Sequence, residues 1–190
     1  MPNHALAPAL QRFVDDVTAL VESGAGEAEL HPKVGEAMKA LVREDNWLDE
    51  SVSVPHPEYY QQYLLYADPD DRFSVVSFVW GPGQKTPIHD HTVWGVIGML
   101  RGAEYEQAYV IREHERPAPS GDETRLLPGD VGLVSPSIGD VHLVRNAYDD
   151  QVSISIHAYG TNIGKQKRHV FPAEGGPAKE FISGYSDPVQ

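Results

Sequence analysis

The sequence predicts a mainly β protein, a barrel or sandwich of short strands that follows two α-helices. From about residue 59 the chain consists of eight short runs rich in Val, Ile, Tyr and Phe, separated by clusters of Gly, Pro and Asp. Short strands at regular spacing with turn signals between them are typical of all-β sandwiches and barrels. The chain has 190 residues, which is enough for one well-buried core and usually means one domain.

Two segments before the strands have helical periodicity. Residues 8–23 place apolar side chains on one helical face, and Gly24 and Gly26 mark the end of this helix. Residues 33–43 repeat the same spacing, and we expect both helices to cover one side of the strands. The organisation expected for the single domain is a helical part over residues 1–50, a β-barrel core over residues 59–160 and a C-terminal extension over residues 161–190.

The eight expected strands follow from local composition. In chain order the runs are QYLLYA, FSVVSFVWG, VWGVIGMLRG, AEYEQAYVI, TRLL, DVGLVS, VHLVRN and QVSISIHAY. Most are dominated by the β-branched and aromatic residues that pack well in strands. The chain ends in GGPAKEFISGYSDPVQ, whose Gly, Pro and Ser content indicates a surface extension.

Composition excludes several functional classes. Cysteine is absent, which excludes disulfides, thiolate metal sites and cysteine nucleophiles. The net charge of −13 argues against nucleic acid and anionic membranes as partners, because both bind basic surfaces. No stretch approaches the ~20 apolar residues of a membrane helix, and the N-terminal residues lack the pattern of a secretory signal. We therefore expect a cytoplasmic protein, and the sequence indicates no obligate protein partner.

The segment TPIHDHTVWG, residues 86–95, indicates a metal site. In a strand, His89 and His91 lie on the same face while Asp90 points the other way. His142 begins a later strand after a turn and is the candidate third ligand. Three neutral imidazoles suit iron, copper, zinc or nickel, so these residues alone leave the metal open. A barrel with buried, metal-free histidines is the alternative.

The spacing of glycine and proline around these histidines resembles that of a known superfamily. The first group is Gly83, His89, His91, Gly95 and Gly102, and the second is Pro136, Gly139, His142 and Asn146. The two groups resemble the paired motifs of the cupin superfamily, although the second has one residue more than usual between its proline and its glycine. The resemblance implies a cupin double-stranded β-helix, or jelly-roll barrel. Many cupins have a glutamate ligand where this chain has Gly95, so the implied site consists of three histidines.

The run QVSISIHAYG alternates the polar residues Ser155, His157 and Tyr159 with apolar ones, so one face of the expected strand is polar. An inward polar face requires hydrogen-bond partners for each group, and a stripe that faces solvent is the alternative. Together with the three histidines and the upstream Tyr60 and Gln62, this run resembles the cysteine dioxygenase family of thiol dioxygenases.

This resemblance implies a non-haem Fe(2+) enzyme that adds both atoms of O2 to a small thiol and yields a sulfinate. It assigns the iron ligands to His89, His91 and His142, the catalytic relay to Ser155, His157 and Tyr159, and substrate binding to Tyr60 and Gln62. The implied partners are therefore a small-molecule thiol and O2.

Two departures from the family pattern bear on chemistry and substrate. Mammalian cysteine dioxygenases crosslink a cysteine to the active-site tyrosine, but the aligned position here is Gly95, so Tyr159 is expected to be unmodified. Cysteine-specific members carry an arginine that pairs with the substrate carboxylate. The aligned position here is Gln62, which resembles the 3-mercaptopropionate dioxygenase branch. Arg168, in the basic segment GKQKRH, is the candidate source of the missing positive charge, and a solvated surface arginine is an equal alternative.

Three other functions stay open at this point. The first is a cysteine dioxygenase that converts L-cysteine to cysteine sulfinate. The second is another enzyme class on the same barrel, a metal-dependent isomerase or a ring-cleaving dioxygenase. The third is a small-molecule-binding module without catalysis, which would consume no oxygen when a thiol is added.

Overall fold

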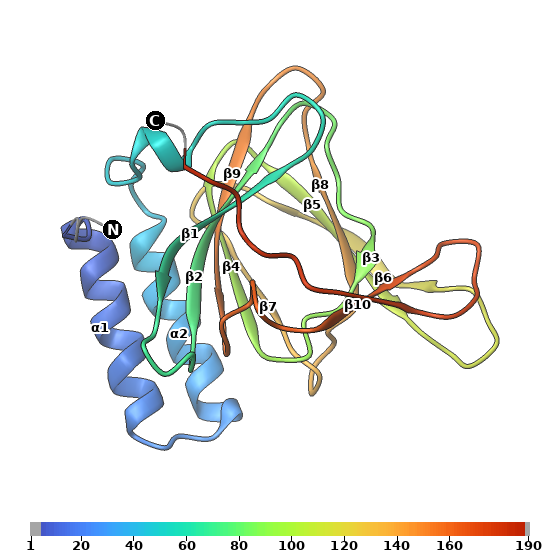
Figure 1. Cartoon of the computed structure of the whole chain (residues 1–190), viewed down its shortest axis with the longest axis horizontal. Coiled ribbons are helices and arrows are strands. Elements are labelled where there is room, and N and C mark those ends of the chain that lie inside the picture. The colour runs from blue at the N-terminus through green and yellow to red at the C-terminus, as the bar shows by residue number, and fades with distance from the viewer. Residues whose placement is uncertain (1–4, 189–190) are drawn as a thin grey trace.

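Two helices lie against one side of a β-barrel in the computed structural model, which describes residues 5–188 (Figure 1). Helix α1 (Pro8–Glu22) has a proline at its start, where the missing N–H would have no intrahelical partner in any case. Its buried face consists of Leu10, Phe13, Val14 and Val17. The first predicted helix is therefore confirmed.

Helix α2 (Glu27–Leu41) begins earlier than residue 33, where the second helix was expected to start. Pro32 lies inside this helix, where it cannot donate one of the intrahelical hydrogen bonds. In a sequence, a proline at such a position indicates a helix boundary. Glu29 in the first turn interacts favourably with the helix dipole, and Met38 is fully buried. Neither this helix nor any other within residues 5–188 is long and apolar enough to cross a membrane.

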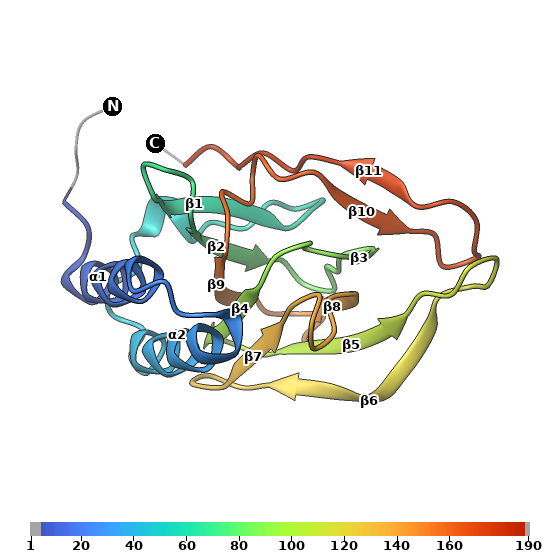
Figure 2. The same ribbon diagram turned by 90° about the horizontal axis from the view of Figure 1, so that it is seen from below.

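The strands form two antiparallel sheets that face each other (Figure 2). Their bounds are β1 (Gln61–Ala67), β2 (Ser74–Trp80), β3 (Ile88–His89), β4 (Gly95–Arg101), β5 (Glu104–Val110), β6 (Ala118–Leu126), β7 (Val131–Val134), β8 (His142–Asn146), β9 (Ser153–Tyr159), β10 (Arg168–Phe171) and β11 (Lys179–Phe181). A short 3-10 helix, η1 (Glu50–Val52), precedes them. One sheet has the order β1-β2-β9-β4-β7 and the other has the order β11-β10-β3-β8-β5-β6.

Each of the eight predicted runs overlaps one strand, so the mainly β cupin barrel with N-terminal helices is confirmed. The short strands β3, β10 and β11 are additional to the prediction. Strand β6 begins at Ala118, well before the predicted run TRLL, and most of its residues are exposed. It is one of the two edge strands of its sheet, and the pattern of a half-buried strand is missing from its sequence.

The apolar core lies on both sides of the sheet that contains β9 and consists of three clusters. Ile154, Ile156 and Ala158 pack toward the helices in the larger cluster, whereas Tyr159 belongs to a cluster between the two sheets. Strand β9 is buried along its whole length, so its polar residues face the barrel interior. The solvent-facing alternative for the Ser155, His157 and Tyr159 stripe is therefore wrong.

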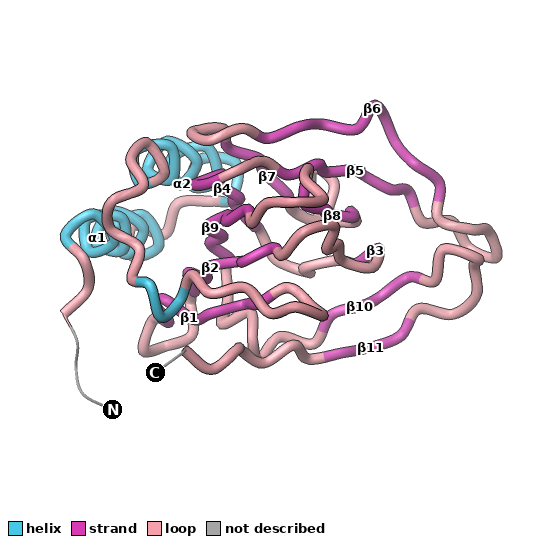
Figure 3. The backbone as a smooth tube through the Cα atoms, turned by 90° about the horizontal axis from the view of Figure 1, so that it is seen from above, coloured by secondary structure: helices cyan, strands magenta, loops and turns pink. Residues whose placement is uncertain are grey.

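The chain after β9 closes the open edge of the barrel. Strand β10 pairs with β3, and the segment that follows β11 returns along β1 (Figure 3). The backbone N–H of Ser186 donates to the Gln62 carbonyl at 2.8 Å, and the Ser186 hydroxyl accepts the Gln62 N–H at 3.0 Å. We call residues 183–186 the tail segment. This segment lies along β1 and does not simply extend into solvent.

Candidate metal centre and substrate pocket

The side chains of His89, His91 and His142 meet inside the barrel. Their ring centroids are 4.7 to 4.9 Å apart, and one nitrogen from each ring lies within 4.8 Å of the other two. All three residues are buried, and His91 has no exposed surface. The sequence placed these three imidazoles in one site, and the structure brings them together.

Strand register and one carboxylate position the three rings. His89 ends β3 and pairs directly with His142, the first residue of β8. His91 lies just beyond β3, where the chain turns through Thr92 with a φ of 64°. The Asp140 carboxylate accepts hydrogen bonds from the backbone N–H of His91 at 3.1 Å and of Thr92 at 2.8 Å. This carboxylate therefore fixes the turn that returns His91 to the site.

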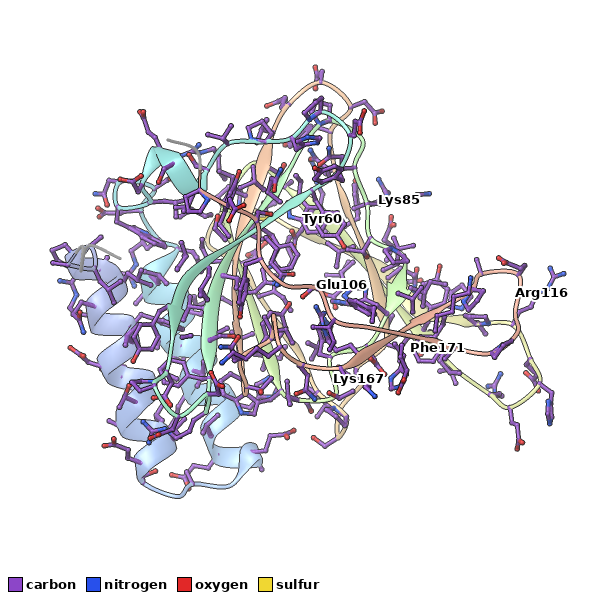
Figure 4. The ribbon with its side chains drawn as sticks, viewed as in Figure 1. Tyr60, Lys85, Glu106, Arg116, Lys167 and Phe171 are labelled. Carbon is purple, nitrogen blue, oxygen red and sulfur yellow. The ribbon has the colours of Figure 1, made fainter. Side chains whose placement is uncertain are left out.

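An acceptor occupies the Nδ1 side of each imidazole. The acceptors are the Pro87 carbonyl for His89 at 3.0 Å, the Asp140 carboxylate for His91 at 2.9 Å and the Glu106 carboxylate for His142 at 2.7 Å. Figure 4 shows Glu106 within the outline of the barrel, whereas Arg116 lies at a distant loop tip. Because these oxygens accept, each ring holds its proton on Nδ1 and presents the Nε2 lone pair to the centre.

These residues fit a bound transition metal. The Nε2 of His91 is buried and has no hydrogen-bond partner among the described residues, which is rare for a buried polar atom. Burial lowers the pKa of His89 and of His91 well below the ordinary value, so both rings are neutral, as metal ligands must be. Carboxylate or carbonyl acceptors behind each imidazole are typical of metal sites.

Ser155, His157 and Tyr159 form a continuous hydrogen-bonded chain along β9. Ser155 Oγ lies 2.8 Å from His157 Nε2, and His157 Nδ1 lies 2.8 Å from the Tyr159 hydroxyl. The Tyr159 ring stacks on His91, with ring centroids 5.3 Å apart. Burial raises the pKa of Tyr159 and lowers that of His157, so both side chains are neutral. This series of hydrogen bonds thus ends at the neutral phenol of Tyr159, beside the metal ligand His91.

Gly95 leaves the space that the Tyr159 ring occupies. A Cβ at this position would lie 3.0 Å from Cε1 of Tyr159 and 2.9 Å from Cγ2 of Val134. The Gly95 carbonyl accepts a hydrogen bond from Nε2 of His31 at 2.8 Å, which links α2 to this strand. The absence of a side chain here removes a fourth metal ligand and also makes room for the tyrosine.

A pocket of about 800 Å³ reaches His89 from the surface. Its wall includes Tyr60, Gln62 and Arg168, so the structure brings the three candidate substrate-binding residues to one cavity. The Tyr60 ring packs against that of Trp80 in a tilted arrangement, with ring centroids 5.0 Å apart, and lies inside the barrel outline in Figure 4. The pocket wall therefore contains both aromatic and polar side chains.

Arg168 is buried, with 3% of its surface exposed, which rules out a solvated surface arginine. Its Nη2 donates to Ser183 Oγ at 2.8 Å, and its guanidinium lies 4.7 Å above the Phe181 ring. Its Nε has no hydrogen-bond partner among residues 5–188. Arginine keeps its charge even where burial lowers its pKa. A buried cation in this state is stabilised by an anion that enters the pocket.

Gln62 holds the tail segment against the pocket wall. Its Nε2 lies 3.3 Å from both Ser183 Oγ and the Gly184 carbonyl and donates to them. Ser183 therefore bonds to Gln62 and to Arg168, so the two candidate residues share one partner.

Several residues of the site were not identified from the sequence. Glu104 and Glu106 alternate in the run AEYEQAYVI and so share one strand face, which was a usable signal. Asp140 stands two residues before His142, but its carboxylate accepts from His91, 49 positions away, so local spacing gave no signal for it. Ser183 gave no signal, because nothing local relates a tail serine to the metal motifs.

The fold and the three-histidine centre define a metal-binding cupin. Comparison with protein-family models adds the family: the model for cysteine dioxygenase type I matches residues 13–169. The chain belongs to this family, and its three-histidine site is consistent with a thiol dioxygenase. Membership implies a thiol substrate and O2.

Solved structures resemble the chain at low sequence identity. An uncharacterized conserved protein with a double-stranded β-helix domain from Klebsiella pneumoniae is 16% identical, with 72% of this chain and 100% of that chain covered and a TM-score of 0.47. A cupin superfamily protein from Desulfitobacterium hafniense is 12% identical, with 63% and 94% covered and a TM-score of 0.46. A cupin-like protein from Thermotoga maritima is 18% identical, with 77% and 92% covered and a TM-score of 0.45. None of these similarities bears on the substrate.

Proposed function

We propose that the protein is an iron-dependent thiol dioxygenase that oxidises a small thiol carboxylic acid, with 3-mercaptopropionate preferred over L-cysteine. The observation that carries the proposal is the buried guanidinium of Arg168 in the pocket that reaches His89. A substrate with a thiol at one end and a carboxylate at the other matches a metal centre and a cation that share one cavity.

His89, His91 and His142 would hold the metal through their Nε2 atoms. Ferrous iron in this position would supply the redox chemistry with O2 and favour the thiolate form of the substrate. Several metals suit three imidazoles, and membership of the cysteine dioxygenase type I family supports iron among them.

The protein's own residues would bind and orient the substrate. Arg168 pairs with the carboxylate, and Tyr159 donates its hydroxyl hydrogen bond to the reacting groups while His157 holds the phenol in place. Aromatic rings in the pocket wall, those of Tyr60 and Phe78 among them, would limit the access of water to the cavity. Fixed positions of this kind lower the entropy cost of bringing the reactants together.

The preference for 3-mercaptopropionate rests on the α-ammonium of cysteine. Gln62 stands where cysteine-specific members have an arginine, and Arg168 instead offers the positive charge. Of the described residues that line the pocket, Asp187 is the acidic one, and it is exposed. Burying an ammonium without a carboxylate partner costs free energy, and 3-mercaptopropionate lacks this group. A tenfold preference in kcat/KM needs ~1.4 kcal/mol of differential transition-state binding.

Oxygen uptake by the iron-loaded protein tests the proposal. We expect the highest kcat/KM with 3-mercaptopropionate when it is compared with L-cysteine, cysteamine and mercaptosuccinate at equal iron loading. An equal or higher kcat/KM with L-cysteine would contradict the substrate preference. No uptake with any of these thiols would contradict the dioxygenase function.

The role of Arg168 is tested by Arg168→Met, with Arg168→Lys as the matched control that keeps the charge. A hydrogen bond to a charged group contributes ~1.5–3 kcal/mol, so kcat/KM for 3-mercaptopropionate should fall roughly tenfold to a hundredfold in the methionine variant. The lysine variant should lose less. Cysteamine has no carboxylate and serves as the internal control. An equal loss with cysteamine would show that Arg168 acts on the fold and not on the carboxylate.

A further inference from the structure

A buried carboxyl group lies at the inner end of the hydrogen-bonded chain on β9. Glu104, the first residue of β5, has no exposed surface, and neither of its carboxyl oxygens makes a hydrogen bond of ordinary geometry with the described residues. The Ser155 hydroxyl and the Trp80 indole face it from the opposite sheet. A buried carboxyl without firm partners is costly, which suggests a role beyond packing.

Ser155 connects this carboxyl group to the rest of the chain. Its Oγ accepts a hydrogen bond from Trp80 Nε1 at 3.1 Å and lies 2.8 Å from His157 Nε2. A serine hydroxyl has one proton, so Ser155 donates either to His157 or to Glu104. A neutral imidazole has one donor and one acceptor nitrogen, so this choice fixes the direction of the next hydrogen bond as well.

We propose that Glu104 is a positioning residue that sets the direction of hydrogen bonding along Ser155, His157 and Tyr159. With Glu104 neutral, its O–H donates to Ser155, Ser155 donates to His157 Nε2, and His157 Nδ1–H donates to the Tyr159 oxygen. The phenol proton is then free to be donated toward the metal centre. The catalytic consequence of this arrangement rests on the proposed function, but the arrangement itself does not.

With Glu104 ionised, each hydrogen bond in the chain reverses. Ser155 donates to the carboxylate, His157 Nε2–H donates to Ser155, and the Tyr159 hydroxyl donates to His157 Nδ1. The phenol proton is then turned away from the metal centre, although no heavy atom has to move far. Loss of the Glu104 proton to solvent therefore changes what Tyr159 offers the substrate.

The surroundings of Glu104 favour its neutral form. Burial raises the pKa of Glu104 to about 8, and the negative charge of Glu106 on the same strand adds to the effect. Tyr159 on β9 interacts electrostatically with Glu104, and His157 is the other titratable group of that chain. The strands paired with β5 place Asn146 and Leu126 opposite Glu104, and β2 contributes Trp80, none of which titrates. The neutral orientation is thus the one expected at neutral pH.

The tautomer of His157 reports this direction without any catalysis. In the metal-free protein labelled with 15N-histidine, the NMR signals of His157, assigned by their loss in His157→Asn, should show the Nδ1–H tautomer at pH 6. They should show the Nε2–H tautomer above pH 9, with a midpoint set by Glu104 at about pH 8. Because the midpoint is measured in the unsubstituted protein, the test does not depend on any Glu104 variant folding.

Glu104→Gln provides the second arm of the test. Its amide N–H donates to Ser155 at every pH, so His157 should keep the Nδ1–H tautomer from pH 6 to pH 9. Glu174→Gln, an exposed position, is the matched control and should switch like the parent. A single tautomer over the whole range in the parent, or a switch that persists in Glu104→Gln, would overturn the proposal.

Activity gives an independent readout that a purely structural role would not change. We expect kcat of the iron-loaded parent to fall as pH rises through about 8, where Glu104 ionises, and this alkaline decrease should be absent in Glu104→Gln. A tautomer switch without oxygen uptake from any thiol would leave this inference intact and remove the proposed function. Oxygen uptake without a tautomer switch at His157 would overturn this inference and leave the proposed function intact.

Discussion

Replacing Gly95 with alanine should destabilise the protein and displace the Tyr159 ring without changing any metal ligand. The new Cβ would lie 2.9 Å from Cγ2 of Val134 and 3.0 Å from Cε1 of Tyr159, well inside the ~3.5–4.0 Å at which carbon atoms attract each other. Strand β4 is hydrogen-bonded on both edges, to β7 and to β9. The backbone therefore cannot retreat, and the two side chains must give way.

The size of this effect follows from the cost of overpacking. An extra methyl group in a well-packed core costs ~1–3 kcal/mol, and a chain of this length loses ~2–4 °C in Tm per kcal/mol. The expected decrease for Gly95→Ala is therefore about 2–12 °C. Val134→Ala removes one of the two clashing groups. The double variant should be more stable than the sum of the single changes by ~0.5–3 kcal/mol.

Thermal unfolding of the metal-free variants, followed by circular dichroism, measures these differences. Gly35→Ala is the matched control, because a Cβ there meets Leu133 at an ordinary 3.4 Å and the position lies in helix α2, where alanine is favoured over glycine. The control should keep or raise the Tm. An unchanged Tm for Gly95→Ala, with an unchanged near-ultraviolet spectrum from the aromatic rings, would refute the argument that Gly95 is required by Tyr159.

Three further predictions concern the metal centre and stability. His142→Ala should fold, because the apolar core does not depend on the ion, but it should bind little iron. Metal analysis of the purified variant checks this, and full iron occupancy would contradict the assignment of His142 as a ligand. Glu106→Leu should weaken metal affinity ~10–100-fold because His142 loses its acceptor, and Glu106→Gln should lose less; competition with a chelator measures both. The hydrogen bonds of Arg72 hold the pKa of buried Asp68 at about 2. Since the folded-state pKa is the lower one, this pair stabilises the fold above about pH 4 and loses its effect as pH falls toward 2. The Tm difference between Asp68→Asn and the parent should therefore be larger at pH 7 than at pH 3.

The barrel and its metal ligands could be predicted because their signals are local. The alternation of two histidines around Asp90 is visible within three residues, and Asp90 does point away, accepting hydrogen bonds from His169. Strand β9 was predicted from its own period-two pattern. Which way its polar face points was not decided locally, because the answer depends on the two helices that cover the opposite face.

The residues that could not be predicted are those that depend on distant parts of the chain. Ser183 meets Gln62 across 121 positions in the sequence, and no spacing rule connects them. The start of α2 was hidden by Pro32, whose local preference is overridden by packing of the helix on the barrel. The alternation of Glu104 with Glu106 places both on one strand face, but the burial of Glu104 becomes clear only when the two sheets are placed face to face.

One wall of the pocket that reaches His89 is made by the tail segment, which is attached to β1 through hydrogen bonds and includes no fully buried residue. The stretch of the chain that forms this wall is consequently different from the stretches that carry the three histidines. Substitutions at Ser183 or Ser186 can change the width or charge of this wall while the imidazole cage stays as it is, whereas Tyr185 packs against the apolar cluster between the sheets. A directed library at residues 183 and 186 therefore alters this wall of the pocket without touching the residues that hold the three imidazoles.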